Sequence, residues 1–220
     1  GYDFTKFPVG TRFTCKDVVL ELTQIGKECH HGCEIFQKMG ECIMPTNGVF
    51  AKVLHGGKIS VGDEFHVQYR AAVITLSDTA SKGEREDASG AAVEEIVGKE
   101  GYEVVFKKII PDDGDTLTAL LCELSDEDKA DLILTTGGTG FSKRDNTQEA
   151  TMRAVERETP GISEAMRYYS LQITPRAMLS RGVSGIRKEA LIVNLPGSPK
   201  AVRECLEYAI GALTHGIDIL

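Results

Sequence analysis

The feature that most constrains the fold of this chain is an alternation of short apolar runs and amphipathic segments that begins after Tyr69. Unbroken apolar runs are typical of strands that are covered on both faces, and leucines spaced as in 117–124 lie along one face of a helix. Strands are expected at 71–76, 104–110, 132–136 and 190–195, and helices at 87–99, around 117–124, at 147–158, at 161–170 and from Ser198-Pro199 onward. This alternation predicts an α/β fold with a mostly parallel sheet and helices on both faces.

The first 66 residues have a different character, with many glycines and cysteines and with short β-prone runs. Strands are expected at 18–22, 49–54 and 59–61, and a short helix near 33–39. We therefore expect two parts, a small mainly-β segment at 1–66 and an α/β domain at 67–220.

The formal net charge of -8 argues against a nucleic-acid partner, because such proteins present a basic face to the phosphates. A phosphorylated small molecule is compatible with this charge, since a few backbone N–H groups can hold a phosphate locally. The absence of a run of 18 apolar residues predicts that nothing spans a membrane. Six cysteines in a chain of this length, without a signal-like N-terminus, fit a reducing cytoplasm.

Polar or glycine-rich residues follow four of the expected strands. They are Ser77-Asp78, Pro111-Asp112-Asp113-Gly114, Thr136-Gly137-Gly138-Thr139-Gly140 and Asn194-Leu195-Pro196-Gly197-Ser198-Pro199. In an open parallel sheet, ligands bind beyond the carboxyl ends of the strands, where the strand order reverses. A parallel sheet would bring all four groups to this edge, so we expect the functional site there.

The glycine-rich run 137–140 has two interpretations. Glycines let backbone N–H groups approach a phosphate closely, and Thr136 and Thr139 would add hydroxyl donors. A tight strand-to-helix turn that needs positive φ angles would explain the same glycines. The cations of Ser142-Lys143-Arg144 beside this run, in an acidic chain, favour an anion site.

Asp112 and Asp145 are the acidic candidates at the same edge. A phosphate site that holds ATP would need Mg²⁺, which prefers one or two carboxylates together with phosphate oxygens, so two aspartates at one edge fit that need. The alternatives are that Asp112 forms a turn and that Asp145 caps the following helix. A capping aspartate can also face a ligand.

The α/β part resembles the MogA/MoaB family of molybdopterin-binding proteins. The matching stretches are Leu134-Thr135-Thr136-Gly137-Gly138-Thr139-Gly140 with Arg144-Asp145-Asn146-Thr147, Ile110-Pro111-Asp112, 159–167, 179–183 and 195–200. They follow one another in the family's order over about 150 residues. The resemblance implies a homotrimer that transfers an adenylyl group from ATP, held with Mg²⁺, to the phosphate of molybdopterin.

The resemblance also implies residue roles. Asp112 and Asp145 match the family's two functional aspartates and would be catalytic and hold Mg²⁺. The binding residues would be Ser77, Asp78, Thr136, Gly137, Gly138, Thr139, Gly140, Arg144, Glu164, Pro196, Gly197, Ser198 and Lys200. Gln148 stands where the family usually has proline, so a module that binds molybdopterin without turnover is the alternative function.

The first 66 residues resemble the C-terminal half of a MOSC domain. The resemblance lies in 26–33, 40–45, 48–50 and 57–63. It implies a β segment that carries sulfur on a cysteine, for which Cys29 is the best match, and hence a sulfur- or metal-transfer alternative. A zinc site built from Cys29 and the neighbouring histidines and cysteines, or buried inert cysteines, would also explain these residues.

Overall fold

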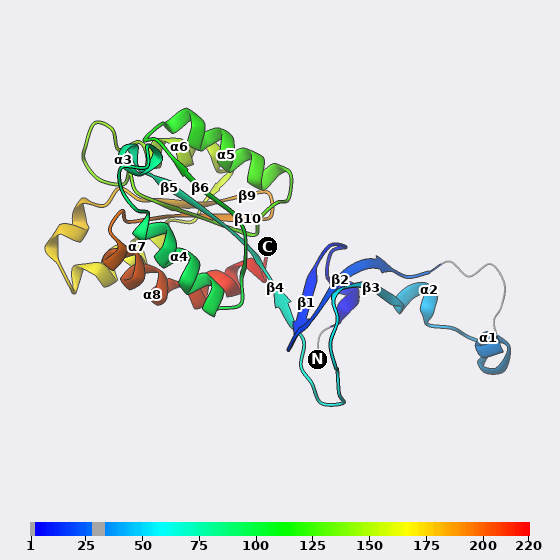
Figure 1. Ribbon diagram of the computed structural model, residues 1–220. Helices are drawn as coiled ribbons and strands as arrows, with labels where there is room; N and C mark the ends of the chain where they lie inside the picture. Colours follow the sequence, from blue (N-terminus) through cyan, green and yellow to red (C-terminus); the bar gives the residue numbers. More distant parts are fainter. Residues whose placement is uncertain (1–2, 28–33) are drawn as a thin grey trace. The chain divides into compact units, whose positions relative to one another are not determined.

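The computed structural model of the chain describes residues 3–27 and 34–220 (Figure 1). The chain divides into two compact units, Gly1–Gln68 and Tyr69–Leu220. The division falls after β4 (His66–Gln68), because β4 pairs with β1 (Arg12–Cys15) of the first unit. In the described part of the chain, no helix combines the length and apolarity that a membrane crossing requires.

The first unit is built on an antiparallel sheet with the strand order β3-β2-β1-β4. β2 spans Val18–Ile25 and β3 spans Val49–His55, as the apolar runs predict; short helices occupy Phe4–Lys6 (η1), Glu34–Met39 (α1) and Met44–Asn47 (α2). Phe13, Cys15, Val18 and Leu22 form its buried core.

One expected strand of the first unit is wrong. Residues 59–61 form no strand, and both Ile59 and Val61 are exposed. The flanking glycines, including Gly62 with a φ of 95°, favour a turn at this point. β1 and β4, which the sequence did not predict, complete the sheet instead.

The second unit is an α/β domain around a six-stranded sheet with the order β6-β5-β7-β10-β9-β8. Four strands are parallel to one another: β5 (Arg70–Leu76), β7 (Leu132–Thr136) and β10 (Ala190–Leu195), which are buried, and the more exposed edge strand β6 (Glu103–Ile110). The short strand β9 (Ser184–Arg187) pairs antiparallel with β10, and β8 (Arg157–Glu158) pairs antiparallel with β9. The predicted mostly parallel sheet is therefore confirmed.

Helices cover both faces of this sheet (Figure 1). One face packs against α4 (Ala88–Lys99), α7 (Pro160–Leu171) and α8 (Pro199–Ile217), and the other against α3 (Asp78–Ser81), α5 (Gly114–Asp126) and α6 (Thr147–Ala154). The 3-10 turn η2 (Pro175–Leu179) follows α7. The predicted leucine face of 117–124 is buried in the second of these layers, so the two-sided packing is as expected.

The expected helix at 147–158 is too long. α6 ends at Ala154, and Val155 already has extended backbone angles that lead into β8. Val155 is β-branched and packs partly against the helical layer of α5 and α6. Residues 157–158 instead pair with β9, and these backbone hydrogen bonds would be lost if α6 continued through them.

The carboxyl ends of β5, β6, β7 and β10 lie at one edge of the sheet, because the strands are parallel. β6 lies on one side of β5 and β7 on the other, so the strand order reverses at β5. A crevice forms beyond the strands at such a reversal. The fold thus brings the loops after β5 and β7 together.

Candidate active site

The loops after β5 and β6 are joined through two aspartates. The backbone N–H of Asp78 donates to the Asp112 carboxylate (3.3 Å), and the N–H of Asp112 donates to the Asp78 carboxylate (3.1 Å). Ser77 caps α3 by accepting from the N–H of Ala80 (3.2 Å). The side chains of Asp78 and Asp112 are therefore fixed against each other's backbone.

The cap of α5 is Asp113. Its carboxylate accepts from the N–H groups of Asp115 (2.9 Å) and Thr116 (3.2 Å). These two hydrogen bonds hold the pKa of Asp113 below its ordinary value. Because Asp113 serves the helix, the neighbouring Asp112 carboxylate is left to face the crevice.

The loop after β7 needs its glycines. Gly137 and Gly138 have φ angles of 97° and 64°, which side chains with a Cβ rarely adopt. A Cβ on Gly137 would lie 2.3 Å from the carbonyl oxygen of Leu76, and one on Gly138 would lie 2.4 Å from Thr147 Oγ1. The tight-turn interpretation of the glycines is therefore correct, and it leaves an anion site open as well.

The backbone of this loop offers donors. Within the described residues, the N–H groups of Gly138, Thr139 and Gly140 donate to no acceptor. Thr139 is nonetheless buried, with 7% of its surface exposed. Unpaired N–H groups in a partly buried loop suit an anion such as a phosphate.

Thr136 does not offer its hydroxyl to a ligand, contrary to expectation. Thr136 Oγ1 donates to the carbonyl oxygen of Pro196 (2.6 Å) and thereby ties the end of β7 to the loop after β10. Gly197 belongs to the same contact, because a Cβ there would lie 3.3 Å from Gly137 Cα. Residues 136, 196 and 197 thus hold the glycine loop against the loop that follows β10.

Asp145 closes the turn that follows the glycine loop. It does not cap α6, which begins after Asn146; its carboxylate instead accepts from the N–H of Ser142 (2.9 Å). A Cβ on Gly140 would lie 2.8 Å from Asp145 Oδ2, and one on Gly138 would lie 3.7 Å from Asp112 Oδ1. Both aspartates therefore adjoin the glycine loop.

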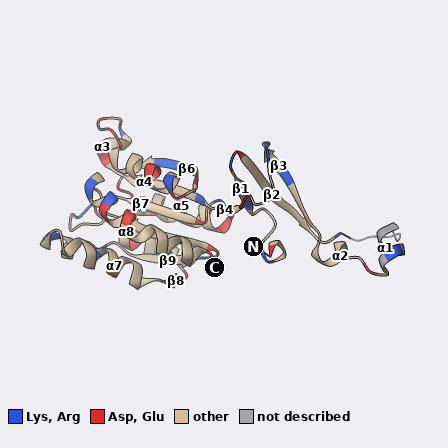
Figure 2. Ribbon diagram, turned by 90° about the horizontal axis from the view of Figure 1, so that it is seen from below, with Lys and Arg blue, Asp and Glu red and all other residues tan. Residues whose placement is uncertain are grey.

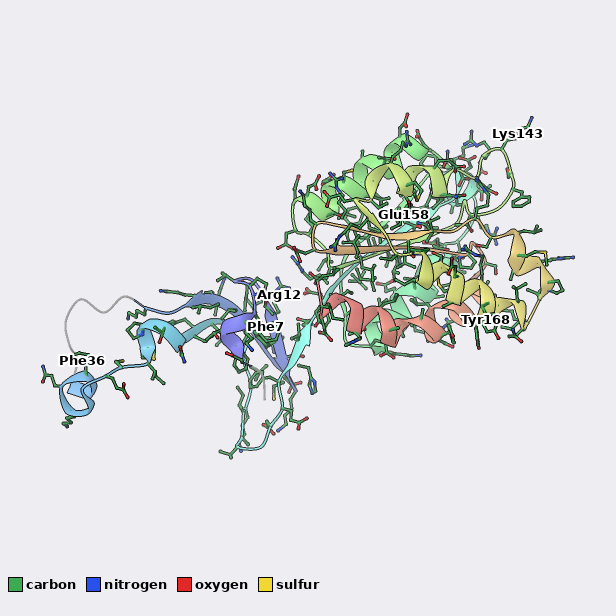
Figure 3. The ribbon with its side chains drawn as sticks, turned by 180° about the vertical axis from the view of Figure 1, so that it is seen from behind. Phe7, Arg12, Phe36, Lys143, Glu158 and Tyr168 are labelled. Carbon is green, nitrogen blue, oxygen red and sulfur yellow. The ribbon has the colours of Figure 1, made fainter. Side chains whose placement is uncertain are left out.

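The electrostatics of the site are dominated by acidic groups. Partial burial, together with the negative charges of Asp78 and Asp145, raises the pKa of Asp112 above its ordinary value. Arg144 makes two hydrogen bonds to the Asp78 carboxylate, of 2.7 and 2.6 Å, so its charge is already engaged. Lys143 lies on the exposed tip of the loop (Figure 3).

The carboxylates of Asp112 and Asp145 are the candidates at this site for holding a divalent cation. No group of three or more histidine, cysteine or acidic side chains in the described part of the chain forms a complete metal cage. Mg²⁺ at nucleotide sites uses one or two carboxylates and completes its shell with phosphate oxygens and water. Burial is the first cause of the raised pKa of Asp112, and the negative charges of Asp78 and Asp145 add to it. A cation relieves such repulsion, and Asp112 and Asp145 both adjoin the glycine loop, so they fit Mg²⁺.

Two cavities lie at this edge of the sheet, and the glycine loop lines one of them. One, called here the α7–α8 cavity, has a volume of about 290 Å³ and is lined by Thr139, Gly140, Ser163, Met166, Arg176 and Pro196 among others. The other, called the Asp112 cavity, measures about 590 Å³ and is lined by Asp112, Asp115, Arg144, Asn146, Glu149 and Arg153 among others. The first is lined by apolar and hydroxyl groups together with Arg167, Arg176 and Glu204, whereas most side chains that line the second are charged.

Asp145 and nine of the expected binding residues line neither cavity; the nine are Ser77, Asp78, Thr136, Gly137, Gly138, Glu164, Gly197, Ser198 and Lys200. Glu164 is exposed on α7, and Lys200 Nζ lies 3.8 Å from the carboxylate of Glu204. Ser198 caps α8 by accepting from the N–H of Ala201 (3.2 Å). Cys29 lies outside the described residues.

Sequence reasoning missed several residues of the α7–α8 cavity. Arg167 lines it and donates to the carbonyl oxygen of Gly182 (2.7 Å). Asn194 lines it at the end of β10 and donates to Thr135 and Thr151. Arg167 lies within a stretch that matches the family, and Asn194 lies at the end of β10 in one of the polar groups expected at this edge, so their positions were the available signal although neither was named as a binding residue.

Comparison with known proteins places this unit in a family. The sequence profile described as a probable molybdopterin binding domain matches residues 72–215. Molybdopterin adenylyltransferases from Helicobacter pylori strain 26695 and from Escherichia coli K12 are 42% and 43% identical over 150 and 155 residues. Each alignment covers 67% of this chain and 85% or 79% of the relative.

Solved structures give the same grouping. The molybdopterin biosynthesis enzyme MoaB from Thermus thermophilus has a TM-score of 0.66 and 42% identity, with coverage of 69% of this chain and 96% of that chain. The tungsten cofactor synthesizing protein MoaB from Pyrococcus furiosus has a TM-score of 0.63 and 35% identity, with coverage of 69% and 96%. This chain belongs to the MogA/MoaB family of molybdopterin-binding proteins.

Proposed function

We propose that the Tyr69–Leu220 unit is a molybdopterin adenylyltransferase of molybdenum cofactor biosynthesis. The observation that carries the proposal is the convergence of Asp112 and Asp145 on a glycine loop that presents unpaired N–H groups. The relatives that share 42–43% of their sequence with this unit bear the name of that enzyme. Both substrates, ATP and molybdopterin, carry phosphate, which such a loop suits.

The two cavities suggest how the substrates divide the site. The α7–α8 cavity, with Met166 and Pro196 beside hydroxyl groups, suits the ring system of molybdopterin. The Asp112 cavity suits the charged polyphosphate of ATP. Gly140 lines the first cavity, and a Cβ there would lie 2.8 Å from Asp145 Oδ2. The molybdopterin phosphate would therefore meet ATP at the loop.

The reaction needs little covalent chemistry from the protein. An oxygen of the molybdopterin phosphate forms a bond to the α-phosphorus of ATP. The bond from that phosphorus to the oxygen shared with the β-phosphate breaks, and pyrophosphate leaves with the electron pair. The loop N–H groups orient the attacking phosphate, and catalysis comes from positioning and from preorganised charge.

Asp112 and Asp145 would hold Mg²⁺ with the phosphates of ATP. When bound, the cation supplies neutralisation of the negative charge that develops on the phosphate oxygens. Asp78 would contribute indirectly, because its carboxylate accepts from the N–H of Asp112 and engages Arg144. The Asp78 carboxylate thus holds the guanidinium of Arg144, which lines the Asp112 cavity.

Pyrophosphate release tests the proposal. The protein, supplied with ATP, Mg²⁺ and molybdopterin, is expected to release pyrophosphate only when all three are present. The alternative is a module that binds molybdopterin without turnover, which the Gln148 departure from the family pattern favours. Binding of molybdopterin without pyrophosphate release would establish that alternative. Gln148 lies in the first turn of α6, which forms without a proline.

We also propose that the enzyme is a homotrimer, as the family resemblance implies. Large apolar side chains on α7, η2 and α8 are exposed in the single chain, among them Tyr168 at 68%, Met178 at 64% and Tyr208 at 50%. Tyr168 points outward from α7 (Figure 3). Burial of such side chains between subunits would be favourable. Light scattering on the purified protein measures the mass directly.

For the Gly1–Gln68 unit we propose a MOSC-like sulfur-carrying role with Cys29 as the carrier. The support is its mainly-β sheet, together with the sequence stretches that resemble the C-terminal half of such a domain. Mass spectrometry after incubation with a persulfide donor tests this role, because the Cys29 thiolate would take the outer sulfur and the donor would leave as its thiol. A persulfide on Cys29 is expected, and its absence, or a stoichiometric bound zinc, would contradict it.

A further inference from the structure

Arg181, in the segment between η2 and β9, forms hydrogen bonds to the 139–145 loop. Its Nε donates to the carbonyl oxygen of Gly140 (2.8 Å), and its Nη2 donates to that of Asp145 (2.6 Å). Its backbone N–H donates to the carbonyl oxygen of Thr139 (2.8 Å). One residue therefore fixes three carbonyl groups of the 139–145 loop, at both of its ends.

The guanidinium of Arg181 is itself held from two sides. Its Nη1 donates to the Glu149 carboxylate on α6 (2.5 Å), and this hydrogen bond lowers the pKa of Glu149. The next residue, Gly182, accepts from Arg167 on α7 (2.7 Å). The Arg181 side chain is 28% exposed. Arg181 and Gly182 together connect the 139–145 loop to α6 on one face of the sheet and to α7 on the other.

The partners of Arg181 belong to different parts of the site. Gly140 lines the α7–α8 cavity, and Glu149 lines the Asp112 cavity. The Asp145 carboxylate adjoins Gly140, so a shift of the loop would move a carboxylate and the unpaired N–H groups together. Reacting groups lose rate steeply when their positions change by about an ångström.

We propose that Arg181 is a positioning residue for adenylyl transfer, which holds the 139–145 loop where it serves both cavities at once. The expected effect on kcat rests on the proposed function. The expected effect of Arg181 on the position of the 139–145 loop does not. The planar fork of an arginine reaches three acceptors in fixed directions, and a lysine ammonium on a flexible stem cannot.

Arg181→Lys is the test variant, because it keeps the positive charge beside Glu149 and removes the fork. Arg187→Lys is the matched control. Arg187 is equally enclosed, with 21% of its side chain exposed, and its guanidinium also binds a carboxylate, that of Asp126, and a backbone carbonyl, that of Ala154. None of these partners lines either cavity.

Two readouts are measured on the full chain. Amide hydrogen exchange is followed in a peptide that covers 139–147, where the N–H groups of Ser142 and Asp145 are protected by the turn they close. Arg181→Lys is expected to speed exchange there and to leave β10 unchanged. For adenylylation, its kcat is expected to fall roughly tenfold or more, with each KM changed by less than about threefold.

Arg187→Lys is expected to leave both the loop exchange and kcat at the wild-type level. Unchanged loop exchange in Arg181→Lys, or an equal kcat loss in Arg187→Lys, would overturn the inference. A rise in KM without a fall in kcat would make Arg181 a binding residue and would overturn it too. If the wild type shows no turnover, the proposed function fails, and the exchange comparison still decides whether Arg181 fixes the loop.

Discussion

Asp145 is placed by a local turn, since its carboxylate accepts from the N–H of Ser142. Asp145→Asn keeps this acceptor and removes the negative charge. We expect kcat for adenylylation to fall roughly a hundredfold, which is typical when a preorganised charged or polar group at the reacting centre is lost. The molybdopterin dissociation constant, measured by titration, should change by less than about threefold, because the charge serves the nucleotide side.

Asp126→Asn is the matched control for Asp145→Asn. Asp126 ends α5, and its carboxylate binds Arg187 on β9 rather than a residue of the 137–145 loop, so its loss should leave kcat near the wild-type value. Normal turnover by Asp145→Asn, or an equal defect in Asp126→Asn, would remove the metal role of Asp145.

Gly138 is needed for backbone geometry. Its φ of 64° disfavours a side chain, and a Cβ there would lie 2.4 Å from Thr147 Oγ1. Gly138→Ala should therefore lower the free energy of unfolding by about 1–3 kcal/mol in a urea titration and should reduce turnover. Gly161→Ala, where no atom lies within 4 Å of the added carbon, is the control. Equal stability of the two variants would contradict this account.

At the residue scale, the sequence predicted the aspartates and missed Arg181. Asp112 and Asp145 follow expected strands or a glycine run, so their position alone placed them at one edge of the sheet. Arg181 acts through backbone carbonyls of Gly140 and Asp145, 41 and 36 residues away. Such contacts leave no mark in local composition, because any loop has carbonyl groups.

At the scale of elements, α4 and α8 are joined at the surface by Glu95. Arg203 and then Lys99 lower the pKa of Glu95 to about 2, from an ordinary value of 4.5. The folded state is therefore stabilised above pH 4.5, and this stabilisation is lost as the pH falls from 4.5 towards 2. Solvent and salt screen such an exposed group, so the effect is small.

Thermal melts of Glu95→Gln across pH 3–7 check this linkage. The variant should melt below the wild type at pH 7, and the gap should narrow as the pH falls below about 4.5. Arg203→Gln should produce most of the same loss, and the double variant little more. A gap that is constant with pH would show that the Glu95 carboxylate charge does not join the two helices.

The elements that the sequence predicted well are those with a strong pattern. β7 matches its expected range, and α4, α5 and α8 follow from apolar spacing and helix starts. β9 was missed because Ser184–Arg187 contains a glycine and no apolar run. β8 was read as the end of a helix, because two residues are too few to show strand periodicity.

At the scale of the molecule, the chain consists of two compact units whose charged residues are interspersed along the ribbon (Figure 2). The family profile covers only residues 72–215 of the second unit. All residues of both cavities also lie in that unit. Adenylylation should therefore not require the first unit.

The fragment Tyr69–Leu220 is expected to fold cooperatively and to keep kcat and both KM values within about twofold of the full chain. A buried core on both faces of its sheet supports independent folding. Circular dichroism melts and the pyrophosphate assay check this. Loss of activity in a fragment that melts normally would show that the first unit contributes to the site.

The central claim is that this chain moves the adenylyl group of ATP onto molybdopterin. Label on the α-phosphorus of ATP, followed by mass spectrometry of the products, tests it most directly. The account predicts labelled adenylyl-molybdopterin in a one-to-one ratio with pyrophosphate, and almost none from Asp145→Asn. Label found only in ATP or in free AMP, with molybdopterin bound but unmodified, would contradict it.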